Sequence, residues 1–518
     1  MSEVKYIGIT IGPICDTLAD ADSPAALWFA SSCFSDLTRR LCAAIAGPKG
    51  IEGAVILSPY YSDAIPLDDG VGKFHDRIIF STEHYDRKKL EAIIAEVRRE
   101  MAEDFMYPGQ KMEKKDIADF LSVYLQIHFV VLNGDHVKEN SILAVSPYLD
   151  AMELMKTFPA DNTGNPFRAI FTGSQDSSNV YLRKSPLFKA VADNNNQFIS
   201  RKGPIRTIQE IAACDGFLAG DLKKHHYFAV VQADGDGMGT FLKGLDDENV
   251  TLFSKSCLEY AREAAAKIGG FGGMTIYAGG DDLLFLAPVE NAADKNVFAL
   301  CQEISHLFQD KMKAVFPDNP QIPTVSFGIS IQYEKFPLYE ALENARQLLF
   351  GEAKTHCYKG MDHAGKNSMA IELQKHSGQT VGLVVSNDSC HVLEEVMALG
   401  NSLSDGENAV NSVLYTIQTY QFLLHVLNRE VLEGRVDKDA YKEAWMNLFD
   451  NVDQKPAESY LNSVCDVWYD YILKGSDKIE AMDGRHFVDL PEKAEEKSMA
   501  VMIYLLRLKK FFVERGED

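Results

Sequence analysis

The chain has 518 residues, 46% hydrophobic and 25% charged, with a formal net charge of −23. This composition is typical of a multidomain globular protein and argues against a chain that binds nucleic acid alone, because such proteins are usually basic. No apolar run of about eighteen residues and no signal-peptide pattern occurs, so we expect no membrane contact. The nine cysteines include no CxxC pair, which favours a reducing cytoplasm.

The first region, residues 1–170, is predicted to mix helices with antiparallel strands. It opens with the strand pattern YIGITIG. A helix follows, which Ser23 caps, Pro24 starts and Gly47 ends. GAVILSPYY and KFHDRIIFS are predicted as two further strands, and a charged helix begins near Arg87.

The second region, residues 220–385, repeats this order of elements. Strands are predicted at 227–233, at MTIYA, at LLFLA and at 324–332, with helices at 251–268 and 293–315. A further helix begins at Pro337. The order β-α-β-β-α-β is that of the ferredoxin-like split unit, so we interpret the two regions as a degenerate duplicated pair.

Two parts remain. Residues 171–219 are expected to be a linker or helical element. Residues 386–518 contain few strand signals and are predicted to form a helical bundle, because their apolar residues recur at helical spacing. These stripes consist of Val413, Ile417, Tyr420, Leu424 and Leu427, and of Met499, Met502 and Leu506. The expected fold class is therefore α+β, with two ferredoxin-like domains and a helical end.

Acidic residues occur at two strand ends of the second region. The segment IYAGGDDLLF carries Asp281 and Asp282 at a predicted hairpin tip. Taken alone, this tip is most simply interpreted as a solvent-exposed turn, because Gly and Asp are common turn residues. The first strand ends at QADGDGMG, with Asp234 and Asp236. In this topology the first and third strands are antiparallel neighbours, so these ends meet at one edge of the sheet. Clustered carboxylates repel one another unless cations are present, and oxygen ligands suit Mg²⁺ or Mn²⁺. We expect Asp234, Asp281 and Asp282 to bind metal.

Glycines and lysines near these acids suggest a nucleotide. Glycines let the backbone approach a phosphate, and a lysine acts on it as a point charge. Two metal ions ~3.5–4 Å apart can activate an attacking hydroxyl and stabilise a leaving pyrophosphate, which is the chemistry of nucleotidyl transfer. For Lys354 the alternative is a lysine placed favourably against a helix dipole. The predicted nucleotide-binding residues are Gly235, Asp236, Gly237, Gly279, Gly280, Lys354 and Lys366.

These motifs resemble a known family. YFAVVQADGDGMG, YAGGDDLLFLAP, TVSFGISI, PLYEALENARQLLFGEAK and GKNSMAIEL are similar to the palm domain of the large, polymerase-like subunit of type III CRISPR effector complexes, of the III-B kind. Diguanylate cyclases share this palm, with GGDEF in place of GGDD. ITIGPICDTL and SPAALWFASSCFSDL resemble the degenerate first palm of the CRISPR subunit, and the helical end resembles its C-terminal bundle.

The resemblance implies an RNA-activated enzyme. Asp234 and Asp281 would be metal ligands, with Asp282 in the same cluster, while Lys354 and the backbone of Gly235 would contact phosphates. In the family, target-RNA binding switches on the conversion of ATP to a second messenger, commonly cyclic oligoadenylate, and some members join AMP to S-adenosylmethionine. The implied partners are the other effector subunits, with guide RNA and target RNA held through the complex.

The sequence departs from the family in two respects. Many members carry an N-terminal HD nuclease domain, but this chain begins at the first palm, so we expect no HD nuclease. His75 is the first histidine, and we interpret His75-Asp76 as a pair at a strand entry. The paired cysteines of a zinc element are also missing.

Two other functions compete with this interpretation. One is a free-standing cyclic-nucleotide synthase, which would need neither the N-terminal palm nor the helical end. The other is a non-catalytic scaffold subunit, against which the intact acidic set argues.

Overall fold

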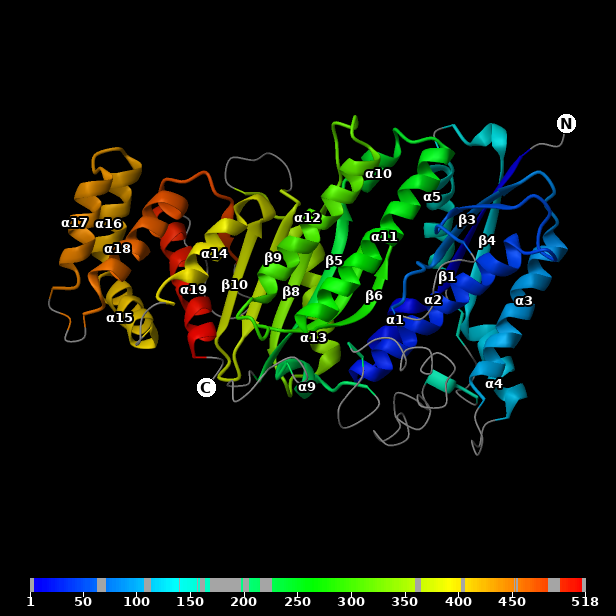
Figure 1. Ribbon diagram of the computed structural model, residues 1–518, viewed down its shortest axis with the longest axis horizontal. Helices are drawn as coiled ribbons and strands as arrows, with labels where there is room; N and C mark the ends of the chain where they lie inside the picture. Colours follow the sequence, from blue (N-terminus) through cyan, green and yellow to red (C-terminus); the bar gives the residue numbers. More distant parts are fainter. Residues whose placement is uncertain are drawn as a thin grey trace.

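The computed structural model describes residues 4–62, 71–106, 113–138, 140–155, 157–158, 164–167, 197–198, 205–214, 226–358, 365–401, 406–450, 452, 455–482 and 494–514. Two sheets lie side by side along the long axis, and helices of the C-terminal region form the far end (Figure 1). The α+β class is confirmed. Most of the predicted linker lies outside the described residues, apart from a short stretch that contains α9 (Ile208–Ala212). Within the described ranges, no helix has the length and apolar character needed to cross a membrane.

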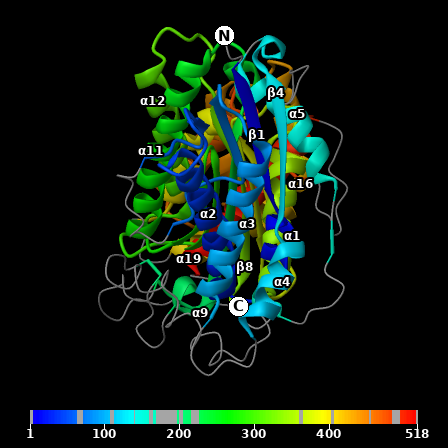
Figure 2. The ribbon, with the colours of Figure 1, turned by 90° about the vertical axis from the view of Figure 1, so that its right-hand side faces the viewer.

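The first sheet has the strand order β2-β3-β1-β4, and all its neighbouring strands are antiparallel. The long helix α2 begins and ends where the sequence predicted. The Ser23 side chain caps it by accepting a hydrogen bond from the amide of Ala26, and Gly47 follows its last turn. Figure 2 views the molecule from this end. We call these elements the first unit: β1 (Lys5–Gly12), α1 (Ile14–Ala19), α2 (Pro24–Ala46), β2 (Val55–Ser58), β3 (Arg77–Thr82), α3 (Arg87–Asp104), α4 (Lys114–Tyr124), β4 (Gln126–Asn133) and α5 (Ser141–Glu153).

The second sheet has the order β11-β10-β9-β8-β5-β7-β6. Its part β8-β5-β7-β6 repeats the topology of the first sheet, strand for strand, which confirms the predicted duplication of the ferredoxin-like order. The second unit consists of β5 (Tyr227–Asp236), α10 (Met238–Leu242), α11 (Asp247–Phe271), β6 (Met274–Gly279), β7 (Asp282–Pro288), α12 (Val297–Val315), β8 (Thr324–Tyr333), α13 (Leu338–Gln347), a π-helical turn (Leu348–Ala353) and β9 (Ser368–Gln374).

The two units share a hydrophobic core. Helix α2 of the first unit packs against β6 of the second, so Trp28 belongs to the same buried cluster as Ile276 and Leu286. On the opposite face of β5, helices α11 and α12 cover Val231 and Ala233. Because fully buried side chains of both units interdigitate, the edges of the two sheets are held in a fixed relation.

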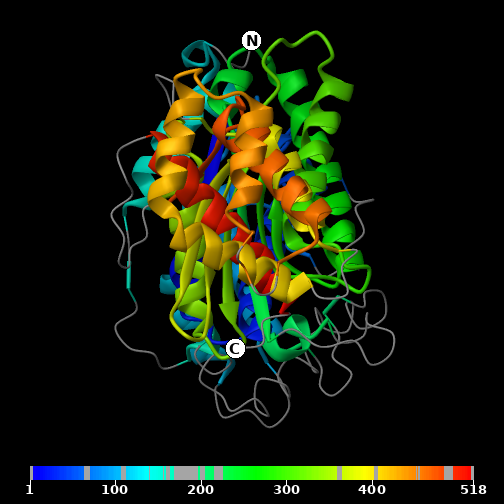
Figure 3. The ribbon, with the colours of Figure 1, turned by 90° about the vertical axis from the view of Figure 1, so that its left-hand side faces the viewer.

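The C-terminal region is helical, as predicted, with one exception. The strand β11 (Ile479–Ala481) pairs antiparallel with β10 (Thr380–Ser386) and extends the second sheet. Three residues at an edge give too short a pattern to predict a strand. In Figure 3 the C-terminal helices lie in front of the sheets. They are α14 (Cys390–Ala398), α15 (Gly406–Thr419), α16 (Gln421–Leu432), α17 (Lys438–Asn447), α18 (Glu458–Val467) and α19 (Ala494–Val513).

Candidate metal and nucleotide site

Three carboxylates gather where two neighbouring strands of the second unit meet. Asp234 lies near the end of β5, and Asp281 and Asp282 form the tip that leads into β7. Their ligand atoms all lie within 4.8 Å of one another, and each residue is half-buried. The antiparallel pairing of β5 with β7 produces this contact, with Ala233 opposite Leu283. The predicted meeting of the two strand ends is therefore confirmed.

The electrostatics of this group favour a bound cation. Burial raises the pKa of Asp281, and burial together with the charge of Asp281 raises the pKa of Asp282 well above its ordinary value. Both shifts reflect the cost of holding like charges together away from water. A divalent cation would remove this cost, so the donor set fits Mg²⁺ or Mn²⁺.

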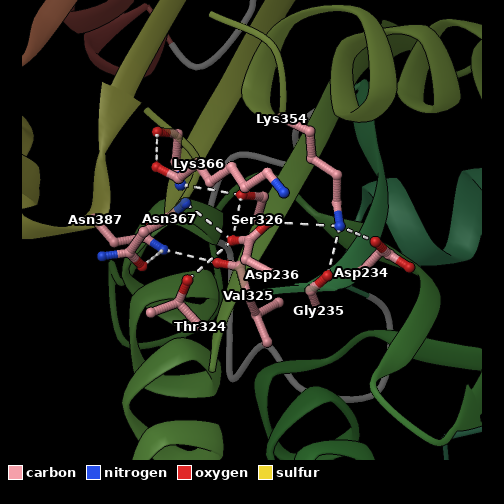
Figure 4. A network of polar contacts seen from close by, with 11 residues as sticks. Asp234, Gly235, Asp236, Thr324, Val325, Ser326, Lys354, Lys366, Asn367 and Asn387 are labelled. Atoms are coloured by element: carbon pink, nitrogen blue, oxygen red, sulfur yellow. Dashed lines mark hydrogen bonds and ion pairs between the residues drawn. The ribbon is translucent and has the colours of Figure 1, made fainter. Parts of the chain in front are cut away.

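Lys354 supplies a positive charge at the edge of the group. It follows the π-helical turn, and its Nζ donates a hydrogen bond of 2.7 Å to the carbonyl of Gly235 and forms an ion pair with Asp234 (Figure 4). Burial, and secondarily the charge of Lys366, lower the pKa of Lys354 to about 8. Its side chain therefore points into the acidic site, whereas a lysine that only caps its own helix would point to the last carbonyls.

Asp236 is buried beside the acidic group and is held by several hydrogen bonds. It is 4% exposed, and its Oδ2 accepts hydrogen bonds from Thr324 Oγ1 (3.0 Å), Ser326 Oγ (2.7 Å) and the amide of Asn367 (2.9 Å). These bonds hold the turn at Lys366 and Asn367, which have φ values of 35° and 46°, against the ends of β5 and β8 (Figure 4). Through Oδ2 this carboxylate anchors the turn, and its Oδ1 lies 3.4 Å from Nζ of Lys354. The contact of Asp236 with a nucleotide stays a prediction.

A cleft beside the acids is lined by the glycine-rich turn. Its volume is ≈ 490 Å³, and it is open to solvent. Gly237 has a φ of 73°, a left-handed value that glycine adopts without strain, and it leaves the cleft wall free of a side chain. The lining residues are Leu143, Gly235, Gly237, Met238, Gly239, Thr240, Lys243 and Lys366.

Only part of the predicted nucleotide set lines this cleft. Gly279 and Gly280 lie instead at the acidic hairpin tip, where Gly280 has a φ of 69°. Lys243 was not predicted, although a basic residue shortly after a glycine-rich turn is a signal that could have found it. Leu143 could not have been found, because it comes from α5 of the first unit.

The second unit matches a known domain family. The family model for the second palm domain of Cas10/Cmr2 matches residues 227–370. The CRISPR system Cmr subunit Cmr2 of Pyrococcus furiosus is 30% identical over 180 residues, which cover 29% of this chain and 19% of that protein. The match thus spans about a fifth of the length of that relative.

Solved structures extend the likeness of fold over the whole chain. The type III-B Cmr-β structure in the apo state aligns with a TM-score of 0.58 and 11% identity, covering 100% of this chain and 82% of that one. Cmr-β bound to cognate target RNA aligns with the same TM-score and identity, covering 99% and 83%. At this identity the likeness concerns the fold alone. Residues 227–370 match the second palm domain of Cas10/Cmr2, and the chain shares 30% identity with the Cmr2 subunit over 180 residues.

Proposed function

We propose that this chain is the nucleotidyltransferase subunit of a type III CRISPR ribonucleoprotein, which converts ATP to a second messenger when target RNA binds. The observation that carries the proposal is the group of Asp234, Asp281 and Asp282, whose ligand atoms lie within 4.8 Å of one another beside a glycine-lined cleft. A scaffold would not need half-buried carboxylates that repel one another.

The chain's own residues divide the chemistry between them. Asp234, Asp281 and Asp282 would hold Mg²⁺ or Mn²⁺, which supplies activation of an attacking hydroxyl and stabilisation of the leaving pyrophosphate when bound. Lys243 and Lys366 line the cleft and would hold the triphosphate of ATP as point charges. A hydroxyl oxygen then bonds to the α-phosphorus while the bond to pyrophosphate breaks.

Partners would hold the RNA. The net charge of −23 disfavours a chain that grips nucleic acid alone, so guide RNA and target RNA would be bound with other effector subunits. We place the complex in the reducing cytoplasm, because the nine cysteines include no CxxC pair. The messenger would be cyclic oligoadenylate or, with S-adenosylmethionine as acceptor, its AMP conjugate.

The test is incubation of the assembled complex with ATP and Mg²⁺ or Mn²⁺, with and without target RNA and S-adenosylmethionine. Products are identified by mass spectrometry. We expect an adenylate product that depends on target RNA. Product made by the isolated chain without RNA would favour a free-standing synthase, and the absence of product under every condition would favour a scaffold.

A further inference from the structure

The turn that brings Lys366 to the cleft has an unusual backbone. Lys366 and Asn367 directly precede β9, and their φ values of 35° and 46° both lie in the left-handed region. Side chains with a Cβ disfavour this region, although Asn tolerates it better than Lys, so such a turn persists only where its surroundings hold it. The Lys366 side chain is exposed and lines the cleft. The groups that hold the turn therefore also decide where its ammonium group lies.

Asp236 holds this turn from one side, and Asn387 holds it from the other (Figure 4). Asn387 follows β10, and the pairing of Ser386 with Ser368 between β10 and β9 places it directly opposite Asn367. The backbone amide of Asn387 donates a hydrogen bond of 2.8 Å to the carbonyl of Asn367, and its Nδ2 donates one of 2.9 Å to Oδ1 of Asn367. Both the backbone and the side chain of Asn387 thus bind the second residue of the turn.

The side chain of Asn387 also reaches the strand next to β5. Its Nδ2 donates hydrogen bonds to the carbonyl of Val325 in β8, at 2.9 Å, and to the hydroxyl of Ser305 in α12, at 3.2 Å. Val325 pairs with Gly235, whose carbonyl accepts the hydrogen bond from Lys354. Asn387 is 6% exposed, so these bonds lie away from water, where hydrogen bonds are stronger. The amide group therefore fixes the turn relative to the strand ends of the site.

A segment of the C-terminal region holds Asn387 itself. Asn387 begins a 3₁₀ turn (Asn387–Ser389). The backbone amide of Ser386 donates a hydrogen bond of 2.9 Å to the carbonyl of Lys478, and the amide of Lys478 donates one of 2.9 Å to Oγ of Ser389. Lys478 directly precedes β11. Asn387 is thus fixed on both flanks by the C-terminal region, while its side chain reaches toward the cleft.

We propose that Asn387 is a positioning residue, which holds the turn at Lys366 and Asn367 so that the ammonium group of Lys366 meets the triphosphate of ATP. The inference rests on the proposed function, in which Lys366 binds phosphate, and adds a residue that acts through Lys366. Without Asn387 the left-handed turn would relax to a backbone conformation that its side chains prefer, and Lys366 would move away from the cleft. Because Lys478 fixes the flanks of Asn387, hydrogen bonds connect the C-terminal region with the phosphate-binding turn.

The experiment measures KM and kcat for ATP in the assembled, RNA-activated complex, for Asn387→Ala alone and in combination with Lys366→Ala. We expect Asn387→Ala to raise KM on the order of 10-fold, as for a weakened charged contact, while kcat stays within about twofold, because ground state and transition state lose the same contact. In the Lys366→Ala background the same substitution should change KM by less than about twofold, since the group that Asn387 positions is then absent. The affinity for a non-hydrolysable ATP analogue should follow the same pattern.

Asn428→Ala is the matched control. Asn428 is fully buried in α16, and its Oδ1 accepts a hydrogen bond of 2.9 Å from the hydroxyl of Tyr441 within the C-terminal helices. Each of the two variants loses a buried, hydrogen-bonded asparagine side chain, so both should lower the unfolding temperature. Only Asn387→Ala should raise the KM for ATP.

Four outcomes would overturn the inference. The first is an unchanged KM in Asn387→Ala. The second is a rise of equal size in the Lys366→Ala background, and the third is an equal rise in Asn428→Ala, which would assign the effect to lost stability. The fourth is failure of both Asn387→Ala and Asn387→Ser to assemble, which would assign Asn387 a structural role. Failure of the proposed function is a separate result, because the native complex would then make no product from ATP, while analogue binding by the same variants would still test the placement of Lys366.

Discussion

Gly235 lies so close to Asp281 that no residue larger than glycine fits at position 235. A Cβ added to Gly235 would lie 2.3 Å from Oδ2 and 2.9 Å from Cβ of Asp281. We therefore predict that Gly235→Ala displaces Asp281 from the acidic group and lowers product formation by at least about 100-fold, as expected when a metal ligand is misplaced. Two quantities are measured: the amount of product formed per complex, and the number of metal ions bound per complex, which titration calorimetry gives.

Gly270→Ala is the control for this substitution. Gly270 lies in α11, and a Cβ there would meet no atom within 4 Å, so the change should leave activity unaltered and stabilise the helix slightly. If Gly235→Ala were as active as Gly270→Ala, the placement of Asp281 at the metal site would be wrong.

The second prediction concerns the acids themselves. Asp281→Asn combined with Asp282→Asn should abolish product formation while the complex still assembles, because both residues lie at a hairpin tip and Asn is nearly isosteric. Asp294→Asn, at a turn away from the site, serves as the control. Full activity in the double variant would refute the proposed function, and loss of assembly would indicate a structural role for the tip.

The pH dependence of stability gives a third prediction. The pKa values of Asp281 and Asp282 are raised in the folded protein, so the folded state binds more protons than the unfolded state above the ordinary Asp pKa. The protonated carboxyls of Asp281 and Asp282 do not lower stability at acidic pH. As the pH rises through their raised pKa values, they ionise and the protein becomes less stable. Without metal, the unfolding temperature of the double Asn variant should therefore exceed that of the native chain by a margin that grows from about pH 4 to about pH 7. A margin that shrinks with pH would contradict the burial of these charges.

Sequence reasoning found the acids but not the role of each. Asp234 and Asp281 follow from topology, because strand order alone brings their strand ends together. Asp236 does not, since aspartate disfavours strands and the predicted strand ended at residue 233. In the structure β5 continues to Asp236, which pairs with Thr324 and stays inside the sheet. The contact of Gly72 with Ala278 before the acidic tip depends on how the two units pack, which no local pattern encodes.

The fourth prediction separates two roles of Lys354. Because its ammonium pairs with Asp234 and holds the Gly235 carbonyl, Lys354→Ala should weaken binding of an ATP analogue by on the order of 10-fold. It should also lower the unfolding temperature of the metal-free chain, and saturating Mn²⁺ should restore it by replacing the lost positive charge. Lys295→Ala, which removes a surface ion pair with Glu303, is the control. A loss of stability that Mn²⁺ does not restore, with unchanged analogue affinity, would show that Lys354 acts only on its helix.

The last prediction tests the junction between the two units. The hydroxyl of Tyr6 in β1 donates a hydrogen bond of 2.7 Å to Asp247 at the start of α11, and burial and this carboxylate raise the pKa of Tyr6 to about 12. Tyr6→Phe should lower the free energy of unfolding by about 1.5–3 kcal/mol, the usual contribution of a hydrogen bond to a charged group. Tyr148→Phe is the control, because Tyr148 is 51% exposed on α5. Urea denaturation of both variants is the measurement. Equal midpoints would mean that the shared apolar core alone joins the units, whereas a lower midpoint for Tyr6→Phe would show that this bond helps to hold the first unit against the second.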